Sequence, residues 1–408
     1  MKRKQRQRKR VKKSSNKPAH ENDEYKSTFK INQALKTENY ALLREIGREE
    51  GFRSDAIRRR VWPFLLHCTD KEVDKVIEGS LETPHKDESQ VKLDVIRSFH
   101  TFSTSILEED KERLQDQLSK VITHVLRSYP SLHYYQGFHD ICSVFILLFG
   151  EKYASKLMEP VALFYLRYEM FMNMDPVLKQ LTILDTFIQL EDKELHAFIS
   201  EAGVLPYYCL SWVLTWCSHD LDSLEKLTRL FDLFLCSNPL MPLYFAAAVV
   251  LSRKKEILAL PCDVSILHSF LTKLPKDLDA QTLCQEACVL EERYPVYDIQ
   301  CKSQIALDQE STVNCFEKDW IPIDNLQDLN NTIQQKVIPI LQTQERKPIE
   351  LVTLKEISSS VNVLDKLRQL DTKDIALYTL FTVGAGVGLV AIFMTNAELL
   401  REWLTSGV

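Results

Sequence analysis

The chain has 408 residues, of which 45% are hydrophobic and 26% are charged, a balance typical of a folded soluble protein. Its formal net charge is −6, and because residues 1–13 carry nine Lys and Arg and no acid, the remainder carries −15. A body this acidic argues against a protein that binds nucleic acid over its whole surface. The ten cysteines show no zinc-binding spacing, so we expect reduced thiols in a cytosolic core.

The pattern of apolar residues divides the chain into four parts. Across the middle, apolar side chains recur at spacings of three and four, which predicts an all-α fold of antiparallel helices over residues 27–300. The basic tail at 1–26 lacks apolar residues and should be disordered. We expect a polar, flexible connector at 301–370 and a separate C-terminal segment at 371–408. The tail has three interpretations: weak attraction to anionic lipid, a nuclear address, or a contact to RNA.

The C-terminal segment contains 21 successive residues without a charge, 375–395. As a helix they would span roughly 30 Å, the thickness of one hydrocarbon core. Because few residues follow, the pattern predicts a single-pass tail anchor with the folded domain on the cytosolic side. A second apolar stretch, 240–251, is too short to cross a bilayer and is predicted to be a core helix.

An early helix is predicted over residues 57–67, after the capping signal Ser54-Asp55. It places Arg58 and Trp62 one turn apart. One interpretation is a basic surface helix with Trp62 in the core, and the other is a helix that grips an acidic or phosphate-bearing partner. The sequence leaves both open.

A later helix, over residues 90–99, carries Val91, Asp94 and Arg97 at spacings of three. Asp94 therefore lies one turn before Arg97 and can hold its guanidinium group in a charge-assisted pair. The plainer interpretation is a surface ion pair that contributes less than ~1 kcal/mol. The spacing by itself favours the plainer interpretation.

The stretch LHYYQGFHD at residues 132–140 gathers polar and aromatic side chains just before an apolar helical run, 141–149. It follows Pro130, which signals a loop because proline disfavours helix at the residue before it. Gln136 is thus expected near the mouth of a helix, where functional side chains tend to concentrate.

The chain lacks the usual signatures of a self-contained catalytic centre. It has no Walker loop, no kinase motif set and no nucleophile elbow. His133, His139 and Asp140 lie close in sequence, but their spacing does not fit one helix face, so no metal site is expected. What remains is an arginine with a partner aspartate, and a glutamine among tyrosines. GTP hydrolysis needs these types, because a glutamine orients the attacking water and an arginine supplied in trans stabilises the transferring phosphoryl group.

At these residues the sequence resembles the TBC family of Rab GTPase-activating proteins. The family's arginine motif, I-x-x-D-x-x-R, is matched by Val91, Asp94 and Arg97, with Val in place of Ile. Its glutamine motif, Y-x-Q, is matched by Tyr134 and Gln136.

A third family feature, R-x-x-x-W on an early helix, is matched by Arg58 and Trp62. Each motif is short, but the three in this order, in an all-helical chain, are specific. The resemblance covers about residues 45–255 and extends over the helices to 292.

The resemblance implies that Arg97 and Gln136 are paired fingers that enter the nucleotide site of a GTP-bound Rab, with Asp94 holding Arg97 and Tyr134 supporting the loop. The residues implied to support the site are Asp94, Tyr134, Tyr135, Gly137, Arg58 and Trp62. The chain would be an activator rather than an enzyme, and it would need no cofactor or metal, because GTP and Mg²⁺ belong to the Rab.

Two longer phrases, 132–140 and 238–247, together with the membrane segment, resemble an endoplasmic reticulum member of the family. That likeness implies a Rab of the early secretory pathway (the Rab-one class) as partner, and the membrane of the endoplasmic reticulum or early Golgi as location. Two alternatives stay open: a catalytically idle Rab-binding scaffold, and a tail-anchored trafficking tether.

Overall fold

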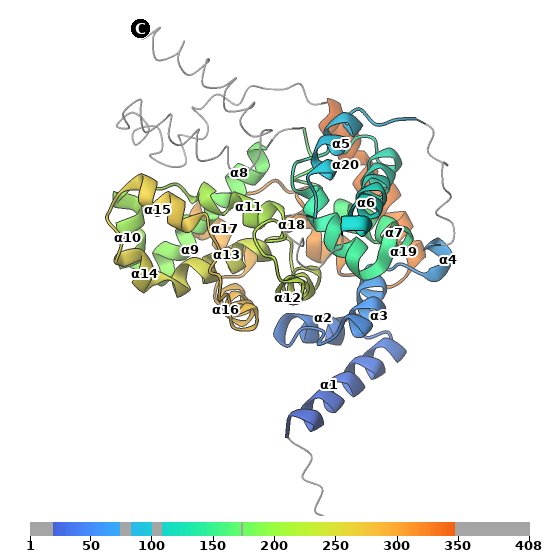
Figure 1. Cartoon of the computed structure of the whole chain (residues 1–408), viewed down its shortest axis with the longest axis horizontal. Coiled ribbons are helices and arrows are strands. Elements are labelled where there is room, and N and C mark those ends of the chain that lie inside the picture. Colours follow the sequence, from blue (N-terminus) through green and yellow to red (C-terminus); the bar gives the residue numbers. More distant parts are fainter. Residues whose placement is uncertain (1–18, 74–82, 100–107, 173, 347–408) are drawn as a thin grey trace, which may run out of the picture.

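The computed structural model describes residues 19–73, 83–99, 108–172 and 174–346, and within these ranges every regular element is a helix (Figure 1). The predicted all-α fold is confirmed for this part of the chain. The predicted membrane segment, 375–395, lies outside the described residues, as do residues 1–18 of the predicted tail.

The helices before the stretch around Gln136 alternate with short loops. Their bounds are α1 Ala19–Lys36, α2 Tyr40–Glu49, α3 Asp55–Leu65, α4 Asp70–Val73, α5 Glu88–Ile96 and α6 Glu108–Ser128. The helices of the middle are α7 Phe138–Phe164, α8 Asp175–Leu181, α9 Ile183–Glu191, α10 Lys193–Glu201, η1 Pro206–Cys209, α11 Leu210–Leu214, α12 Leu224–Leu235 and α13 Met241–Ser252.

The last described helices carry the chain back along the molecule (Figure 1). Their bounds are α14 Lys254–Leu258, α15 Val264–Leu271, α16 Ala280–Arg293, α17 Val296–Ser303, α18 Thr312–Cys315, η2 Phe316–Trp320, α19 Leu326–Thr332, η3 Ile333–Val337 and α20 Ile338–Arg346.

Helix α13 lies at the centre of the packing. Every side chain from Met241 to Val250 is buried, and the helix packs against α9, α11, α12 and α16. A helix that is apolar on all sides is stable only inside a core. The prediction that residues 240–251 form a core helix is therefore confirmed.

Among the described residues, no single helix is both long and apolar enough to cross a bilayer. Two consecutive helical segments, Lys193–Glu201 and Pro206–Leu214, are long and apolar enough only when taken together, and the chain bends by 105° between them.

The predicted connector differs from the structure over residues 301–346, which form helices that pack on the domain. Phe316 and Trp320 are 3% and 1% exposed, and Trp320 lies 4.6 Å from Phe164 between ring centroids. Val337 and Leu341, also four residues apart, are buried as well. The sequence shows no sustained core pattern here, because each helix is short and polar residues surround each pair of apolar anchors.

The boundary of the predicted N-terminal tail also needs correction. Helix α1 begins at Ala19, so the backbone of residues 19–26 is helical rather than disordered.

Candidate functional site

Helix α5 is held firmly at its N-terminal end, which fixes the position of the side chains it carries. Glu88 accepts hydrogen bonds from Nε and Nη2 of Arg127 on α6, at 2.6 and 2.9 Å. This bidentate pair lowers the pKa of Glu88 below its usual value. The preceding Asp87 accepts the backbone N–H of Tyr134 at 2.9 Å. Helix α5 is thereby tied both to α6 and to the loop that carries Gln136.

Arg97 directly follows α5, and its side chain is 52% exposed. Its Nη2 donates to Oδ1 of Asp94 at 2.5 Å, and its Nε donates to the carbonyl of Leu93 at 3.3 Å. The Asp94 side chain is only 1% exposed. The pair is thus more than a surface ion pair, because a buried carboxylate points an accessible guanidinium group outward.

The arginine and glutamine motifs meet at Tyr134. Its hydroxyl donates to Oδ2 of Asp94 at 2.9 Å, across a separation of 40 residues. Burial raises the pKa of the Tyr134 hydroxyl well above its ordinary value, which keeps it protonated as a donor. One buried carboxylate therefore binds Arg97 on one side and the glutamine motif on the other.

The turn that carries Gln136 depends on its two neighbours. Gly137 has a φ of 118°, and a Cβ there would lie 2.9 Å from Cγ2 of Thr215, so a larger residue is excluded. The hydroxyl of the buried Tyr135 donates to the carbonyl of Leu214 at 2.9 Å. Gln136 itself is partly exposed. The turn thus packs against residues 214–215, through a hydrogen bond to Leu214 and a close approach to Thr215.

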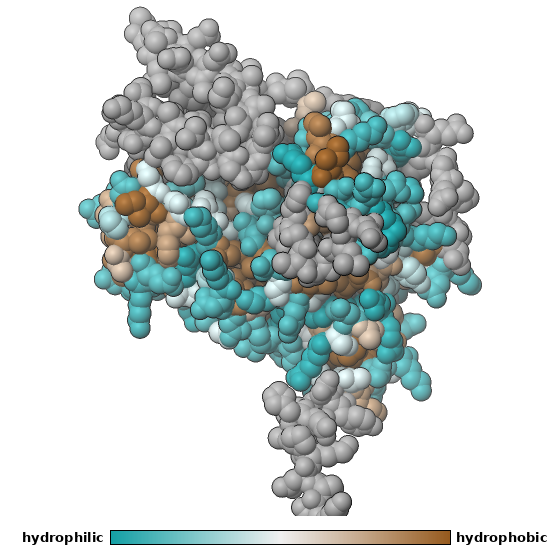
Figure 2. Space-filling model, viewed as in Figure 1, coloured by the Kyte–Doolittle hydropathy of each residue, from teal (hydrophilic) through white to brown (hydrophobic). Residues whose placement is uncertain are grey.

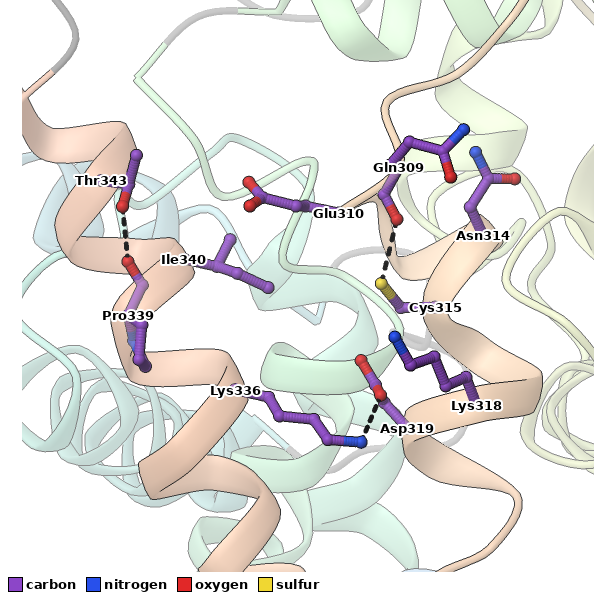
Figure 3. A pocket seen from close by; sticks show the side chains of 10 residues that line it. All are labelled: Gln309, Glu310, Asn314, Cys315, Lys318, Asp319, Lys336, Pro339, Ile340 and Thr343. Atoms are coloured by element: carbon purple, nitrogen blue, oxygen red, sulfur yellow. Dashed lines mark hydrogen bonds and ion pairs between the residues drawn. The ribbon is translucent and has the colours of Figure 1, made fainter.

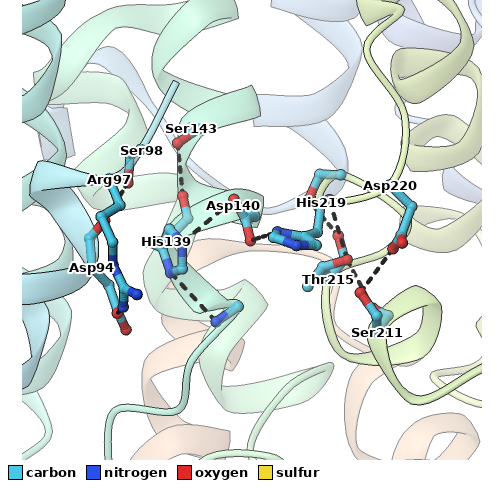
Figure 4. Close-up of polar contacts among 12 residues, drawn as sticks. Asp94, Arg97, Ser98, His139, Asp140, Ser143, Ser211, Thr215, His219 and Asp220 are labelled. Atoms are coloured by element: carbon cyan, nitrogen blue, oxygen red, sulfur yellow. Dashed lines mark hydrogen bonds and ion pairs between the residues drawn. The ribbon is translucent and has the colours of Figure 1, made fainter. Parts of the chain in front are cut away.

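The structure adds residues that the sequence analysis did not assign to the site. His139 lies 2.8 Å from the hydroxyl of Tyr134. Asp140 lies 3.2 Å from Nδ1 of His219 (Figure 4). His139 and Asp140 were considered only as metal ligands, and nothing in the sequence signalled His219. Over the part of the chain that the structure describes, no group of three or more His, Cys, Asp or Glu could hold a metal ion.

Arg58 and Trp62 bind a different carboxylate, that of Asp232 on α12, and their helix α3 is well separated from α5 in Figure 1. Arg58 donates from Nε and Nη2 to the fully buried carboxylate of Asp232, at 2.9 to 3.1 Å. The indole N–H of Trp62 donates to the same carboxylate at 2.8 Å, as does the backbone N–H of Phe52. The structure therefore places both residues in a buried network that joins α3 to α12.

Two cavities lie elsewhere. One, of about 490 Å³, is lined by polar side chains of the C-terminal helices, and Lys336 pairs with Asp319 across it at 2.6 Å (Figure 3). The other, of about 710 Å³, lies between α14 and α15. Neither is lined by Arg97 or Gln136. The arginine and glutamine instead lie at the surface, as expected for groups that act on another molecule.

Comparisons with known proteins show what the chain is similar to. Residues 55–258 match the Rab-GTPase-TBC domain family. The chain is 36% identical over 324 residues to TBC1 domain family member 20 of Homo sapiens, covering 79% of this chain and 80% of that protein. It is 31% identical over 332 residues to GTPase-activating protein gyp10 of Schizosaccharomyces pombe, covering 79% and 86%. The solved Ypt/Rab-GAP domain of Gyp1p shares the fold, with a TM-score of 0.52 and 17% identity over 63% of this chain and 94% of that one.

Proposed function

The chain belongs to the Rab-GTPase-TBC family of GTPase-activating proteins, and from this premise we propose that it accelerates GTP hydrolysis by inserting Arg97 and Gln136 into the nucleotide site of a GTP-bound Rab. The chain then acts as an activator, and the reacting GTP and its Mg²⁺ belong to the partner. Arg97 stabilises the charge that develops on the transferring phosphoryl group, and Gln136 orients the attacking water.

One observation carries the proposal: Asp94 is buried and binds both motifs at once. An arginine already held in place by a buried acid loses little rotamer freedom when it enters the partner. The same acid holds Tyr134, two residues before Gln136, so the two fingers are positioned relative to each other before binding.

The surface around Arg97 supports a protein partner. Leu93 and Ile96, on the same helix, are 58% and 67% exposed, and hydrophobic side chains gather over α5 in Figure 2. Large apolar side chains that stay exposed beside a functional group are typical of a protein interface. Docking of the Rab over α5 would bury them and shield the reaction from water.

The test is single-turnover GTP hydrolysis by purified Rab proteins with the full chain in detergent. We expect Arg97→Ala to lower the acceleration by ~10³-fold or more, and Gln136→Ala to lower it by about 10²-fold. Arg60→Ala is the matched control, since Arg60 is an exposed arginine on α3. Equal rates for all four proteins would sink the finger mechanism, and binding of Rab without acceleration would indicate an idle scaffold.

The same assay tests the choice of partner. On the resemblance of residues 132–140 and 238–247, we propose a Rab of the early secretory pathway, the Rab-one class. The expected result is that this Rab is accelerated more than Rabs of later compartments. A stronger effect on one of the latter would contradict the assignment.

We further propose that residues 375–395 span the membrane of the endoplasmic reticulum or early Golgi, with the helical domain in the cytosol. The support is the uncharged length of this segment, which suits one hydrocarbon core. Deletion of residues 372–408 is expected to release the protein from membranes in cell fractionation, with acceleration in solution unchanged. Persistent membrane binding would instead point to the basic residues 1–13.

A further inference from the structure

We propose that His139 is a positioning residue that couples the Arg97 and Gln136 motifs, because a single atom of its ring contacts both the turn after Gln136 and the Tyr134 hydroxyl that reaches Asp94, the partner of Arg97. The proposal rests on the function proposed above and concerns how the two fingers are held together. His139 is 8% exposed and is the second residue of α7, two positions after Gly137.

The Nδ1 atom of His139 has two neighbours. It lies 2.8 Å from the Tyr134 hydroxyl, which also reaches Asp94, the partner of Arg97. It also lies 3.3 Å from the backbone nitrogen of Gly137, which directly follows Gln136. The same ring nitrogen thus touches the support of one finger and the turn that carries the other.

These contacts cannot all be hydrogen bonds at the same time. The Tyr134 hydroxyl has one hydrogen, the Asp94 carboxylate only accepts, and Nδ1 either carries a proton or offers a lone pair. With a proton on Nδ1, His139 donates to Tyr134, and Tyr134 donates to Asp94. Without that proton, Nδ1 offers one lone pair: it accepts from the Gly137 N–H while Tyr134 still donates to Asp94, or it accepts from Tyr134 and Asp94 loses that donor. The position of one proton therefore changes the hydrogen bonding of both motifs together.

The far side of the ring is held in place. Nε2 lies 3.4 Å from Oδ1 of Asp140, and Oδ2 of Asp140 lies 3.2 Å from Nδ1 of His219. Figure 4 shows Asp94, His139, Asp140 and His219 in one row across the site. Asp140 thus lies beside Nε2 on one side of the ring, while Nδ1 faces Tyr134 and the backbone of Gly137 on the other.

Three substitutions separate the roles of the two ring nitrogens. In His139→Asn a polar atom occupies the place of Nδ1, in His139→Gln one occupies the place of Nε2, and His139→Leu keeps neither. In single-turnover assays with the full chain, we expect Leu and Gln to lower the saturating hydrolysis rate about tenfold, the effect of one buried hydrogen bond. Asn should stay within about threefold of wild type, and the concentration for half-maximal rate should stay unchanged in all three.

A double substitution identifies the route. If His139 acts through the Tyr134 hydroxyl, His139→Leu should add little further loss in a Tyr134→Phe background. His124→Leu is the control for loss of a mostly buried histidine, because His124 pairs with Glu159 on α7, outside the site. The proposal is overturned if His139→Leu accelerates GTP hydrolysis by the Rab as well as wild type does, while Arg97→Ala does not accelerate it. Three further results would overturn it as well. These are a saturating rate for His139→Asn no higher than for His139→Leu, an effect of His139→Leu on the half-maximal concentration alone, and full additivity of His139→Leu with Tyr134→Phe.

A second measurement does not depend on activity. The side-chain Nε–H signal of Arg97, assigned by its loss in Arg97→Lys, is recorded by ¹⁵N NMR in the chain alone. We expect this signal to shift in His139→Leu and to stay near its wild-type position in His139→Asn and in His124→Leu. An unchanged Arg97 signal in His139→Leu overturns the coupling, whatever the hydrolysis assay shows. A failure of the chain to accelerate any Rab would count separately, against the proposed function.

Discussion

In the part of the chain that the structure describes, two buried aspartates, Asp94 and Asp232, hold arginines, and the exposure of the arginine distinguishes their roles. Asp232 is fully buried and pairs with Arg58, whose side chain is 8% exposed. Asp94 is equally buried, but its partner Arg97 is 52% exposed. The first arginine can only join α3 to α12, whereas the second can reach another molecule. Motif spacing alone does not show this difference.

Replacement of Arg58 should therefore affect stability rather than activation. Arg58→Ala leaves the Asp232 carboxylate buried without its guanidinium, and we expect the free energy of unfolding to fall by about 3–5 kcal/mol. Chemical denaturation checks this, with Arg60→Ala as the exposed control expected within about 1 kcal/mol of wild type. A variant of normal stability that activates Rab poorly would show instead that Arg58 contacts the partner.

At the scale of elements, the helices from α18 to α20 belong to the folded domain. Trp320, at the end of η2, packs against Phe164 and Tyr165 at centroid distances of 4.6 and 5.7 Å. A buried indole removes a large apolar area from water, which offsets the entropy lost by ordering short helices. These helices are thus stable through packing rather than through their own propensity.

Loss of that anchor should destabilise the domain. We expect Trp320→Ala to lower the free energy of unfolding by about 3–5 kcal/mol, because a large cavity forms in the core. Tyr297→Ala, at a position 76% exposed, is the matched aromatic control and should have little effect. Equal denaturation midpoints for Trp320→Ala and wild type would show that the C-terminal helices do not stabilise the domain.

At the scale of the whole molecule, buried titratable groups make stability depend on pH. Burial, together with the nearby charge of Arg44, lowers the pKa of His67 from 6.5 to about 4. His67 lies against Tyr40 and Trp320, and among the described residues neither of its ring nitrogens has a hydrogen-bond partner. The folded protein therefore keeps this ring neutral, whereas the unfolded chain protonates it below pH 6.5.

The contribution of His67 has a definite sign. Because its folded pKa is the lower one, the folded state loses stability as pH falls from 6.5 toward 4, by up to about 3 kcal/mol. Glu169 acts in the opposite direction, since burial raises its pKa to about 7 and its contribution is lost as pH rises from 4.5 through 7. The difference between wild type and His67→Phe in urea denaturation isolates the histidine. Parallel curves for the two proteins between pH 7 and 4.5 would refute the assignment.

The sequence by itself determined what depends on neighbours along one helix. The spacing of Asp94 and Arg97 predicted their pairing, because residues three apart meet on a helix surface. The continuous apolar run at 240–251 predicted a core helix, because it is too short to cross a bilayer. The order of three short motifs led to the family, which the comparisons confirm.

Only the tertiary structure decided what depends on how distant helices pack. It placed Tyr134 against Asp94 and gave Arg58 its partner Asp232. It also folded residues 301–346 onto the domain through isolated apolar anchors such as Trp320. The reason is physical, because helical periodicity fixes only which residues share a face of one helix. The contacts of Tyr134 with Asp94, 40 residues apart, and of Arg58 with Asp232, 174 residues apart, depend on which helix faces pack together in the folded core.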